Sequence, residues 1–235
     1  MRVIVWGASG HMGRLVCQVV QERGHQLVGR VSRAIRELAP ADVIIDFSLA
    51  ACTPSLLNYA LQQKLPVVIA TTGHTAEQQA QIEQAAKTVP VLQAVNFSVG
   101  LNLLLTLVET AARVLVDSDI EIVEVHHRHK QDAPSGSAKE LLAVLQRALG
   151  HGQPVYGRHG VAPRQQHEIG VHAVRGGNIM GKHQVQFFTD SETLTLTHTV
   201  HDRRVYAEGA VKAAEFLYQQ PAGYYTIKDL LETRR

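Results

Sequence analysis

The sequence predicts an α/β protein in which a doubly wound parallel sheet is followed by an α+β part with an open antiparallel or mixed sheet. Two observations support this fold class. Up to about residue 96, short apolar segments typical of fully buried parallel strands alternate with helical patterns. Beyond that point, strands with alternating polar and apolar residues follow one another directly.

Five strands and three helices are expected in the first part of the chain. The strands are predicted at residues 3–6, 26–31, 41–47, 66–70 and 89–94. The helices are predicted from about residue 15 to residue 24, over residues 53–64 and over residues 75–87. Thr53 and Pro54 mark the start of the second helix, because proline is favoured in the first helical turn.

The second part is expected to begin with a long apolar helix at residues 101–116 and a half-exposed strand at residues 119–125. A helix at residues 132–149 is predicted to start at Pro134 and to stop at Gly150. Three strands follow at residues 166–174, 181–189 and 192–201. The chain returns to helix at residues 206–218 and 226–231, and we expect the last helix to pack on the first part of the chain.

Composition and charge describe a globular protein that has no general attraction to nucleic acid or membranes. The 235 residues are 45% hydrophobic and 19% charged, and the formal net charge is only +2. The N-terminus enters a strand and a glycine turn at once, without the apolar segment of a signal peptide, so a cytoplasmic location is expected. Cys17 and Cys52 lie in apolar-rich segments without a CxxC pair, which predicts buried free thiols.

The first chemical motif is a glycine turn, GASGHMG, at residues 7–13. Its glycines permit a tight strand-to-helix turn and a close approach of backbone N–H groups to a pyrophosphate, and the helix N-terminus adds partial positive charge. Because the motif follows a strand and opens a helix, it predicts a dinucleotide site. The alternative is a glycine-rich turn needed only for packing.

The end of the second strand bears on the choice of cofactor. Dinucleotide sites that hold a ribose 2′-hydroxyl usually carry an acidic residue here, whereas this chain has Ser32 and Arg33, with Arg30 nearby. The fork of an arginine side chain suits a 2′-phosphate. NADPH is therefore favoured and NADH stays possible, and the alternative is a solvated basic loop.

Polar residues also close three further strands. Asp46-Phe47-Ser48, Thr71-Thr72-Gly73 and Val95-Asn96-Phe97 each stand at the C-terminal end of an expected strand. In open α/β sheets this edge forms the ligand crevice. The recurrence of such residues at successive strand ends favours contacts with a ribose or a nicotinamide amide.

The second chemical motif is the run EVHHRHKQDAPSGS at residues 124–137. If the strand continues, Glu124, His126, Arg128 and Lys130 share one face, and His127 and His129 lie on the other. Pro134 is expected to start a helix whose first turn offers free N–H groups to a carboxylate. The run therefore suits a small dicarboxylate, with one carboxylate on the helix start and the other on His127 and Lys130, and a histidine or lysine could supply a proton.

Other readings of this run are a solvated basic loop, a metal site or a nucleic-acid patch. His126, His127 and His129 are potential metal ligands, but an adjacent arginine and lysine disfavour a cation, so no metal is expected. No aromatic residues interleave with the basic ones, and the overall charge is near neutral, so no nucleic-acid partner is expected.

The run EVHHRHKQDAPSGSAKEL resembles the motif E-x-H-H-x-x-K-x-D-x-P-S-G-T-A of the dihydrodipicolinate reductase family. The segments GASGHMG, DFS, TTG, NFSVG, VRGGNIMGKH and GYYTIKDLL are similar to that family in the same order. The resemblance covers essentially the whole chain. Its specificity comes from HHxxKxDxPSG, because the glycine turn alone is shared with many other families.

The resemblance implies a Rossmann-like dinucleotide-binding domain at residues 1–96 and 206–235, and a substrate-binding and oligomerisation domain with a mixed sheet at residues 97–205. It also implies a homotetramer joined through the substrate-domain sheets. The family reduces 4-hydroxy-tetrahydrodipicolinate to tetrahydrodipicolinate with NADH or NADPH and loss of water, in the synthesis of diaminopimelate and lysine.

Carried over position by position, the resemblance makes His126 the catalytic proton donor or acceptor and Lys130 the proton donor. The residues that it implies for the substrate carboxylates are His127, Ser135, Gly136 and Ser137, assisted by Lys130. The residues that it implies for the cofactor are Gly7, Ala8, Ser9, Gly10, His11, Met12, Arg33, Thr71, Thr72, Gly73, Ala94, Val95, Asn96 and Phe97.

Four departures from the family pattern concern mainly the cofactor pocket. Ser137 replaces a usual threonine but keeps a hydroxyl, His11 replaces a common arginine, and Ser32 replaces the usual acidic residue. The segment between Arg33 and Pro40 is short for the family, so the helix usually found there is expected to be absent. One alternative function is another two-domain NAD(P)-dependent dehydrogenase, but such an enzyme has no reason to carry HHxxKxDxPSG. A second alternative is a non-catalytic NADPH-binding sensor. A sensor would keep the glycine turn but could lose Lys130 or the serine-glycine helix start, and this chain has both.

Overall fold

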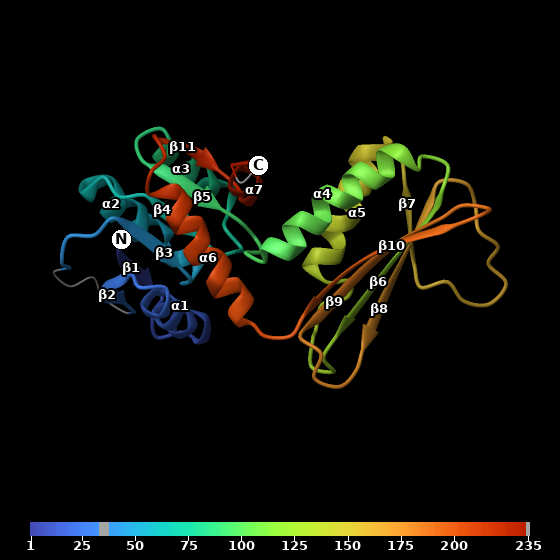
Figure 1. The fold of residues 1–235 in the computed structure, drawn as a ribbon, viewed down its shortest axis with the longest axis horizontal. Coiled ribbons are helices and arrows are strands. Elements are labelled where there is room, and N and C mark those ends of the chain that lie inside the picture. The colour runs from blue at the N-terminus through green and yellow to red at the C-terminus, as the bar shows by residue number, and fades with distance from the viewer. Residues whose placement is uncertain (33–37, 234–235) are drawn as a thin grey trace. The chain divides into compact units, whose positions relative to one another are not determined.

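The computed structural model describes residues 1–32 and 38–233 of the chain. The chain forms two compact units, one of residues Met1–Val99 with Arg203–Arg235 and one of residues Gly100–Asp202 (Figure 1). The α/β fold class expected from the sequence is confirmed, because one unit contains a parallel sheet and the other a mixed sheet, both with helices.

The first unit is built on a six-stranded parallel sheet. Its strands are β1 (Arg2–Trp6), β2 (Gln26–Val31), β3 (Val43–Asp46), β4 (Val67–Ile69), β5 (Pro90–Gln93) and β11 (Gly223–Tyr225). The order β11-β5-β4-β3-β1-β2 places β1 next to both β2 and β3, so the chain winds first to one side of β1 and then to the other. A ligand crevice is expected beside this reversal, at the carboxyl ends of the strands.

Helices cover both faces of this sheet (Figure 1). The strand β1 shows why: Val3 and Val5 pack in one core cluster, and Ile4 and Trp6 pack in another. The first cluster includes residues of α1 (His11–Glu22), α6 (Arg204–Leu217) and α7 (Ile227–Glu232). The second includes residues of α2 (Thr53–Gln63), which follows the short helix η1 (Ala50–Cys52), and of α3 (Ala76–Ala86).

The second unit has a mixed sheet of five strands in the order β10-β9-β6-β8-β7. They are β6 (Asp119–His126), β7 (Gln153–Tyr156), β8 (Glu168–Arg175), β9 (Gly181–Phe188) and β10 (Thr193–Val200). The strand β6 is parallel to β8 and antiparallel to β9. The helices α4 (Val99–Val114) and α5 (Gly136–Leu149) pack against one face of the sheet and bury alternate residues of β6, including Ile120 and Ile122.

Several element boundaries differ from the expected ones. Helix α5 begins at Gly136 and not at Pro134, because Ser135 is its N-cap and its hydroxyl accepts a hydrogen bond from the Ala138 N–H group at 3.2 Å. The strands β7 and β11 were not expected. They are four and three residues long, too short to show a period in the sequence.

Both cysteines are free thiols; Cys17 is buried, and Cys52 is half-buried rather than buried. None of the helices formed by residues 1–32 and 38–233 combines the length and apolar character needed to span a bilayer.

Helix α6 contacts the backbone of Phe97 through a glycine. A Cβ atom added at Gly209 would lie 1.7 Å from the Phe97 carbonyl oxygen, so the helix can approach only because no side chain intervenes. We expect Gly209→Ala to lower the free energy of unfolding by about 1–3 kcal/mol, although alanine is the better helix former. Urea unfolding measures this change.

Gly176→Ala is the matched control, because a Cβ atom there meets nothing within 4 Å. Equal or greater stability of Gly209→Ala would contradict the close approach of α6 to Phe97.

Candidate active site

The turn between β1 and α1 depends on two glycines. Gly7 has a φ angle of +81°, and a Cβ atom there would lie 2.4 Å from the carbonyl oxygen of Phe47 after β3. A Cβ atom at Gly13 would lie 2.1 Å from the carbonyl oxygen of Gly7. Any side chain at either position would therefore open the turn.

This turn fits the pyrophosphate of a dinucleotide. Helix α1 begins at His11, and its N-cap Gly10 has no side chain that could cap the first N–H groups. Those amides and the positive end of the helix dipole form an anion site of the kind used by nicotinamide dinucleotides. The expected cofactor residues Gly7, Ala8, Ser9, Gly10, His11 and Met12 all lie in this turn and helix start.

The edge of the sheet next to the turn holds a cluster of buried polar groups. One carboxylate oxygen of Asp46 and the hydroxyls of Ser48 and Thr71 are buried together there, and both hydroxyls interact with the carboxylate. The other Asp46 oxygen accepts the Ser48 N–H at 3.0 Å, and burial raises the pKa of Asp46. Polar side chains gathered at the carboxyl ends of the strands suit a polar ligand such as the ribose and amide of a nicotinamide dinucleotide.

The remaining expected cofactor residues follow neighbouring strands. Thr71, Thr72 and Gly73 follow β4, and Ala94, Val95 and Asn96 follow β5, so both segments lie at the carboxyl edge of the sheet. Val95 is 75% exposed there. The side chain of Phe97 is instead part of the core and packs against the ring of Phe47, with ring centroids 6.1 Å apart. Arg33 lies outside the described residues.

The second unit contains a fully buried carboxylate, Glu124, on β6. Two hydrogen bonds of 2.8 and 2.7 Å come from the guanidinium of Arg175, and another of 3.0 Å comes from the Ser135 N–H group. The Nδ1 atom of His126 lies 2.6 Å away. Burial tends to raise the pKa of Glu124, but these hydrogen bonds, those of Arg175 first, hold it below its usual range. Glu124 is therefore ionised at neutral pH.

Glu124 determines the state of the His126 ring. A carboxylate can only accept, so the Nδ1 atom of His126 must carry the hydrogen. Burial holds the pKa of His126 below its usual value although Glu124 acts in the opposite direction, so the ring is neutral at pH 7 and its Nε2 atom is an acceptor. That atom lies near Gly181, where an added Cβ would come within 3.1 Å of it.

Lys130 and His127 lie on the loop after β6. The strand ends at His126, so the expected alternation of faces does not extend to Arg128 or Lys130. The Lys130 ammonium forms an ion pair of 2.8 Å with Asp132, and its charge is among the causes that lower the pKa of His126. His127 is half-buried, and its Nδ1 atom has no hydrogen-bond partner in the described structure.

The start of α5 completes the arrangement. Ser135 is buried, Gly136 is exposed and Ser137 is half-buried in the first turn, where the N–H groups of a helix attract an anion. The hydroxyl of Ser135 lies 3.0 Å from the Nε2 atom of His183 on β9. The structure thus brings Ser135 and His126 together through their shared partner Glu124.

Sequence reasoning missed the parts of Glu124, Arg175 and His183 in this arrangement. The strand register explains the positions of the last two. Arg175 of β8 pairs with His126 of β6, and His183 of β9 pairs with Glu124 of β6. Both residues belong to the VRGGNIMGKH segment, which was noted for its resemblance.

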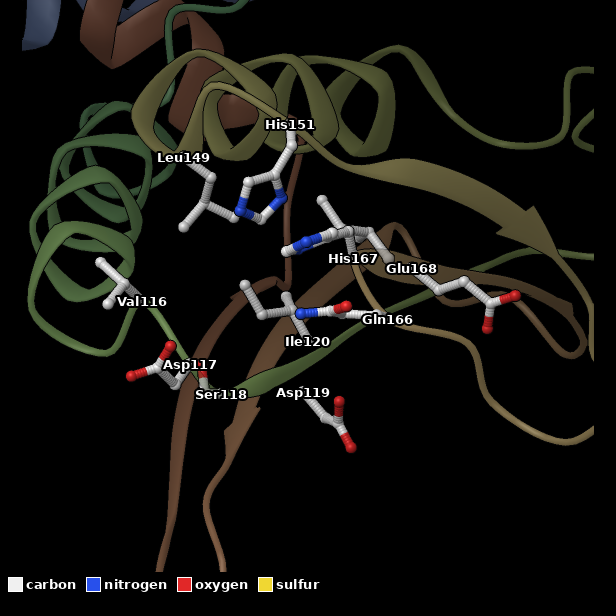
Figure 2. A pocket seen from close by; sticks show the side chains of 11 residues that line it. Val116, Asp117, Ser118, Asp119, Ile120, Leu149, His151, Gln166, His167 and Glu168 are labelled. Carbon is white, nitrogen blue, oxygen red and sulfur yellow. The ribbon is translucent and has the colours of Figure 1, made fainter.

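A separate cavity of about 260 Å³ lies at the other end of β6, near Asp119 and Ile120 (Figure 2). The rings of His151 and His167 lie side by side on its wall, with centroids 4.0 Å apart.

Within residues 1–32 and 38–233, no group of three or more His, Cys, Asp or Glu side chains is arranged to hold a metal ion.

Comparisons with known proteins identify the family of this chain. The family description "Dihydrodipicolinate reductase, N-terminus" matches residues 1–40 and 34–97, and "Dihydrodipicolinate reductase, C-terminus" matches residues 100–231. The 4-hydroxy-tetrahydrodipicolinate reductase of Alkaliphilus metalliredigens is 43% identical over 237 residues, which cover 98% of this chain and 99% of that protein. The reductase of the same name from Akkermansia muciniphila is 43% identical, with 97% of each chain covered.

Solved structures show the same fold. Dihydrodipicolinate reductase from Paenisporosarcina sp. TG-14, solved with dipicolinate bound, has a TM-score of 0.82 at 22% identity and covers 96% of this chain and 97% of its own. The DAP dehydrogenase of C. glutamicum has a TM-score of 0.55 at 13% identity, with 98% and 95% covered. Because the family descriptions match nearly the whole chain, this chain belongs to the dihydrodipicolinate reductase family, as its sequence motifs predicted.

Proposed function

We propose that this protein reduces 4-hydroxy-tetrahydrodipicolinate to tetrahydrodipicolinate with a nicotinamide cofactor and releases water, in the synthesis of diaminopimelate and lysine. The observation that supports this most is the arrangement around Glu124, where a neutral histidine, a lysine and a helix start suited to carboxylates stand together. Two relatives that carry the reductase name are similar to this chain over 98% and 97% of its length.

The first unit is assigned to the cofactor. The amides of the turn at residues 7–12 would hold the pyrophosphate, and the strand ends at residues 71–73 and 94–96 would hold the nicotinamide half. When bound, the reduced nicotinamide supplies the hydride. NADPH is favoured over NADH because Ser32, and no carboxylate, closes β2 and because Arg33 follows it.

The second unit is assigned to the substrate. One carboxylate would bind at the N–H groups and hydroxyls of Ser135, Gly136 and Ser137, and the other at His127 and Lys130. Loss of the 4-hydroxyl together with a neighbouring ring proton releases water and leaves a conjugated imine. Hydride addition to that conjugated system leaves an electron-rich carbon that must gain a proton. Lys130 carries that proton as an ammonium, and neutral His126 offers its Nε2 atom to accept or relay it.

The open face of the mixed sheet supports the homotetramer that the family resemblance implies. Helices α4 and α5 cover one face only, and Val174 and Phe188 on the other face are 46% and 36% exposed. Pairing of these faces between copies would remove that apolar surface from water.

A coupled assay tests the proposed reaction. Substrate is generated in place from pyruvate and aspartate semialdehyde by the upstream synthase, and oxidation of NADPH and NADH is followed in parallel. We expect oxidation that requires both precursors and is faster with NADPH. Arg33→Ala should raise the KM for NADPH about tenfold and leave that for NADH unchanged, because only NADPH has the 2′-phosphate.

A folded protein that binds NADPH but oxidises neither cofactor would overturn the proposed reaction. An unchanged ratio of the two KM values in Arg33→Ala would remove only the assigned cofactor preference.

The proton-transfer residues have a direct test. We expect His126→Ala and Lys130→Ala each to lower kcat by on the order of 10²-fold or more, because general acid–base catalysis contributes that much. His129→Ala is the control, since this exposed histidine stands in the same loop without an assigned role. Steady-state kinetics at saturating cofactor measures the effect, and near-normal turnover in either variant would remove that residue from the mechanism.

The neutral state of His126 predicts a pH dependence. Its pKa lies below the usual value, so the neutral ring persists below pH 6.5 and is lost only as the pH falls through that lowered pKa. Glu124 raises this pKa, so Glu124→Gln should move the acid limb of kcat/KM to still lower pH. It should also reduce kcat by about tenfold or more, because the ring loses its anionic partner.

Glu121→Gln is the matched control, because that carboxylate bonds His172 and takes no part in the Glu124 arrangement. An acid limb that stays in place in Glu124→Gln would show that His126 does not produce it.

A further inference from the structure

His183 has no part in the mechanism above, yet it lies at the centre of the substrate unit's polar groups. The residue is 4% exposed and pairs with Glu124 across β6 and β9. Its ring meets that of His126 edge-on, with centroids 5.2 Å apart, and its Nε2 atom lies 3.0 Å from the hydroxyl of Ser135.

The charge of His183 can be assigned first. Burial, followed by the neighbouring His126, lowers the pKa of His183 to about 4. The ring is therefore neutral near pH 7 and carries one hydrogen, on Nδ1 or on Nε2.

The position of that hydrogen follows from the surroundings. In the described structure the Nδ1 atom of His183 is buried and has no hydrogen-bond partner. A hydrogen on Nδ1 would leave a buried donor unpaired, and unpaired buried donors are rarer than unpaired acceptors. A hydrogen on Nε2 finds the oxygen of Ser135 at once, so this second tautomer is favoured.

This tautomer determines what the Ser135 hydroxyl can do. A hydroxyl has two acceptor lone pairs and one hydrogen to donate. The Ala138 N–H group already occupies one lone pair, at 3.2 Å, and the His183 N–H group would occupy the other. Ser135 can then act towards a ligand only as a donor, which suits an anion and not a cation.

We propose that His183 is a positioning residue that fixes Ser135 as a hydrogen-bond donor for a substrate carboxylate at the start of α5. This inference rests on the proposed function, because that function places the carboxylate there. It adds a residue of β9 to the substrate site and gives the neutral ring a role in binding.

Two amide variants separate this role from simple packing. The side-chain nitrogen of His183→Gln can reach the position of Nε2, whereas that of His183→Asn is one methylene too short. We expect the Kd of dipicolinate, measured by calorimetry on the NADPH-saturated enzyme, to rise at least about tenfold in His183→Asn and to stay within about threefold in His183→Gln. The substrate KM should follow the same pattern while kcat changes little.

Ser135→Ala completes the test. We expect it to weaken dipicolinate binding about as much as His183→Asn, and the double variant to bind no more weakly than either single one. Equal binding by both amide variants, or additive losses in the double variant, would overturn the proposal. The Kd of NADPH should be unchanged in every variant.

The tautomer has its own readout, the two imidazole ¹⁵N shifts of His183 in long-range NMR spectra of the protein without ligands. A hydrogen on Nε2 supports the proposal, and a hydrogen on Nδ1 overturns it. These outcomes are distinct from failure of the proposed function, in which the wild-type enzyme itself would neither turn over the substrate nor bind dipicolinate.

Discussion

The buried carboxylate of Glu124 is the constraint on which the arrangement of the second unit depends. An ionised carboxylate without access to water is costly unless charged and polar groups surround it. Here the compensation comes from three segments at once: the guanidinium of Arg175 on β8, the ring of His126 on β6, and the Ser135 amide before α5. Because each segment must reach the same two oxygens, the carboxylate aligns strand, helix start and histidine in one step.

The same arrangement separates internal charge from the charge offered to a ligand. Glu124 and Arg175 neutralise each other, and both His126 and His183 are neutral near pH 7 because burial lowers their pKa values. The groups that remain for an anion are the amides of the α5 start and the ammonium of Lys130, which is paired with Asp132 at 2.8 Å. A dicarboxylate would thus meet attraction where it binds, while the interior carries no net charge that depends on small changes of pH.

Sequence patterns predicted the parts of this protein that have a local signal in the sequence. The buried strand runs and the GASGHMG turn led to the parallel sheet and its glycine turn, because periodicity and turn chemistry are local properties. The run at residues 124–137 led to His126, Lys130 and the helix start, though the start was placed at Pro134, two residues before the observed one. The Ser135 cap explains that difference. Proline is favoured in the first helical turn and serine at the N-cap, so Pro134 followed by Ser135 is compatible with a helix that starts at Pro134 or just after Ser135.

Partners set by strand register could not be predicted in the same way. His183 lies opposite Glu124 only because β9 is antiparallel to β6, and Arg175 reaches it only because β8 is parallel to β6. A shift of one residue in either pairing would turn these side chains to the other face of the sheet. Neither pairing has a local signal, so the residues that orient His126 become visible only in the folded unit.

The proposed separation of the two chemical tasks has a consequence for how this chain can vary. The residues proposed to bear on cofactor choice, Ser32 and Arg33, belong to the first unit, whereas Glu124 and the groups bonded to it belong to the second. Substitutions at the end of β2 therefore break no hydrogen bond of the buried carboxylate. Loss of the acidic residue usual after β2, together with the short segment that follows, is thus compatible with an intact arrangement of Glu124 and His126.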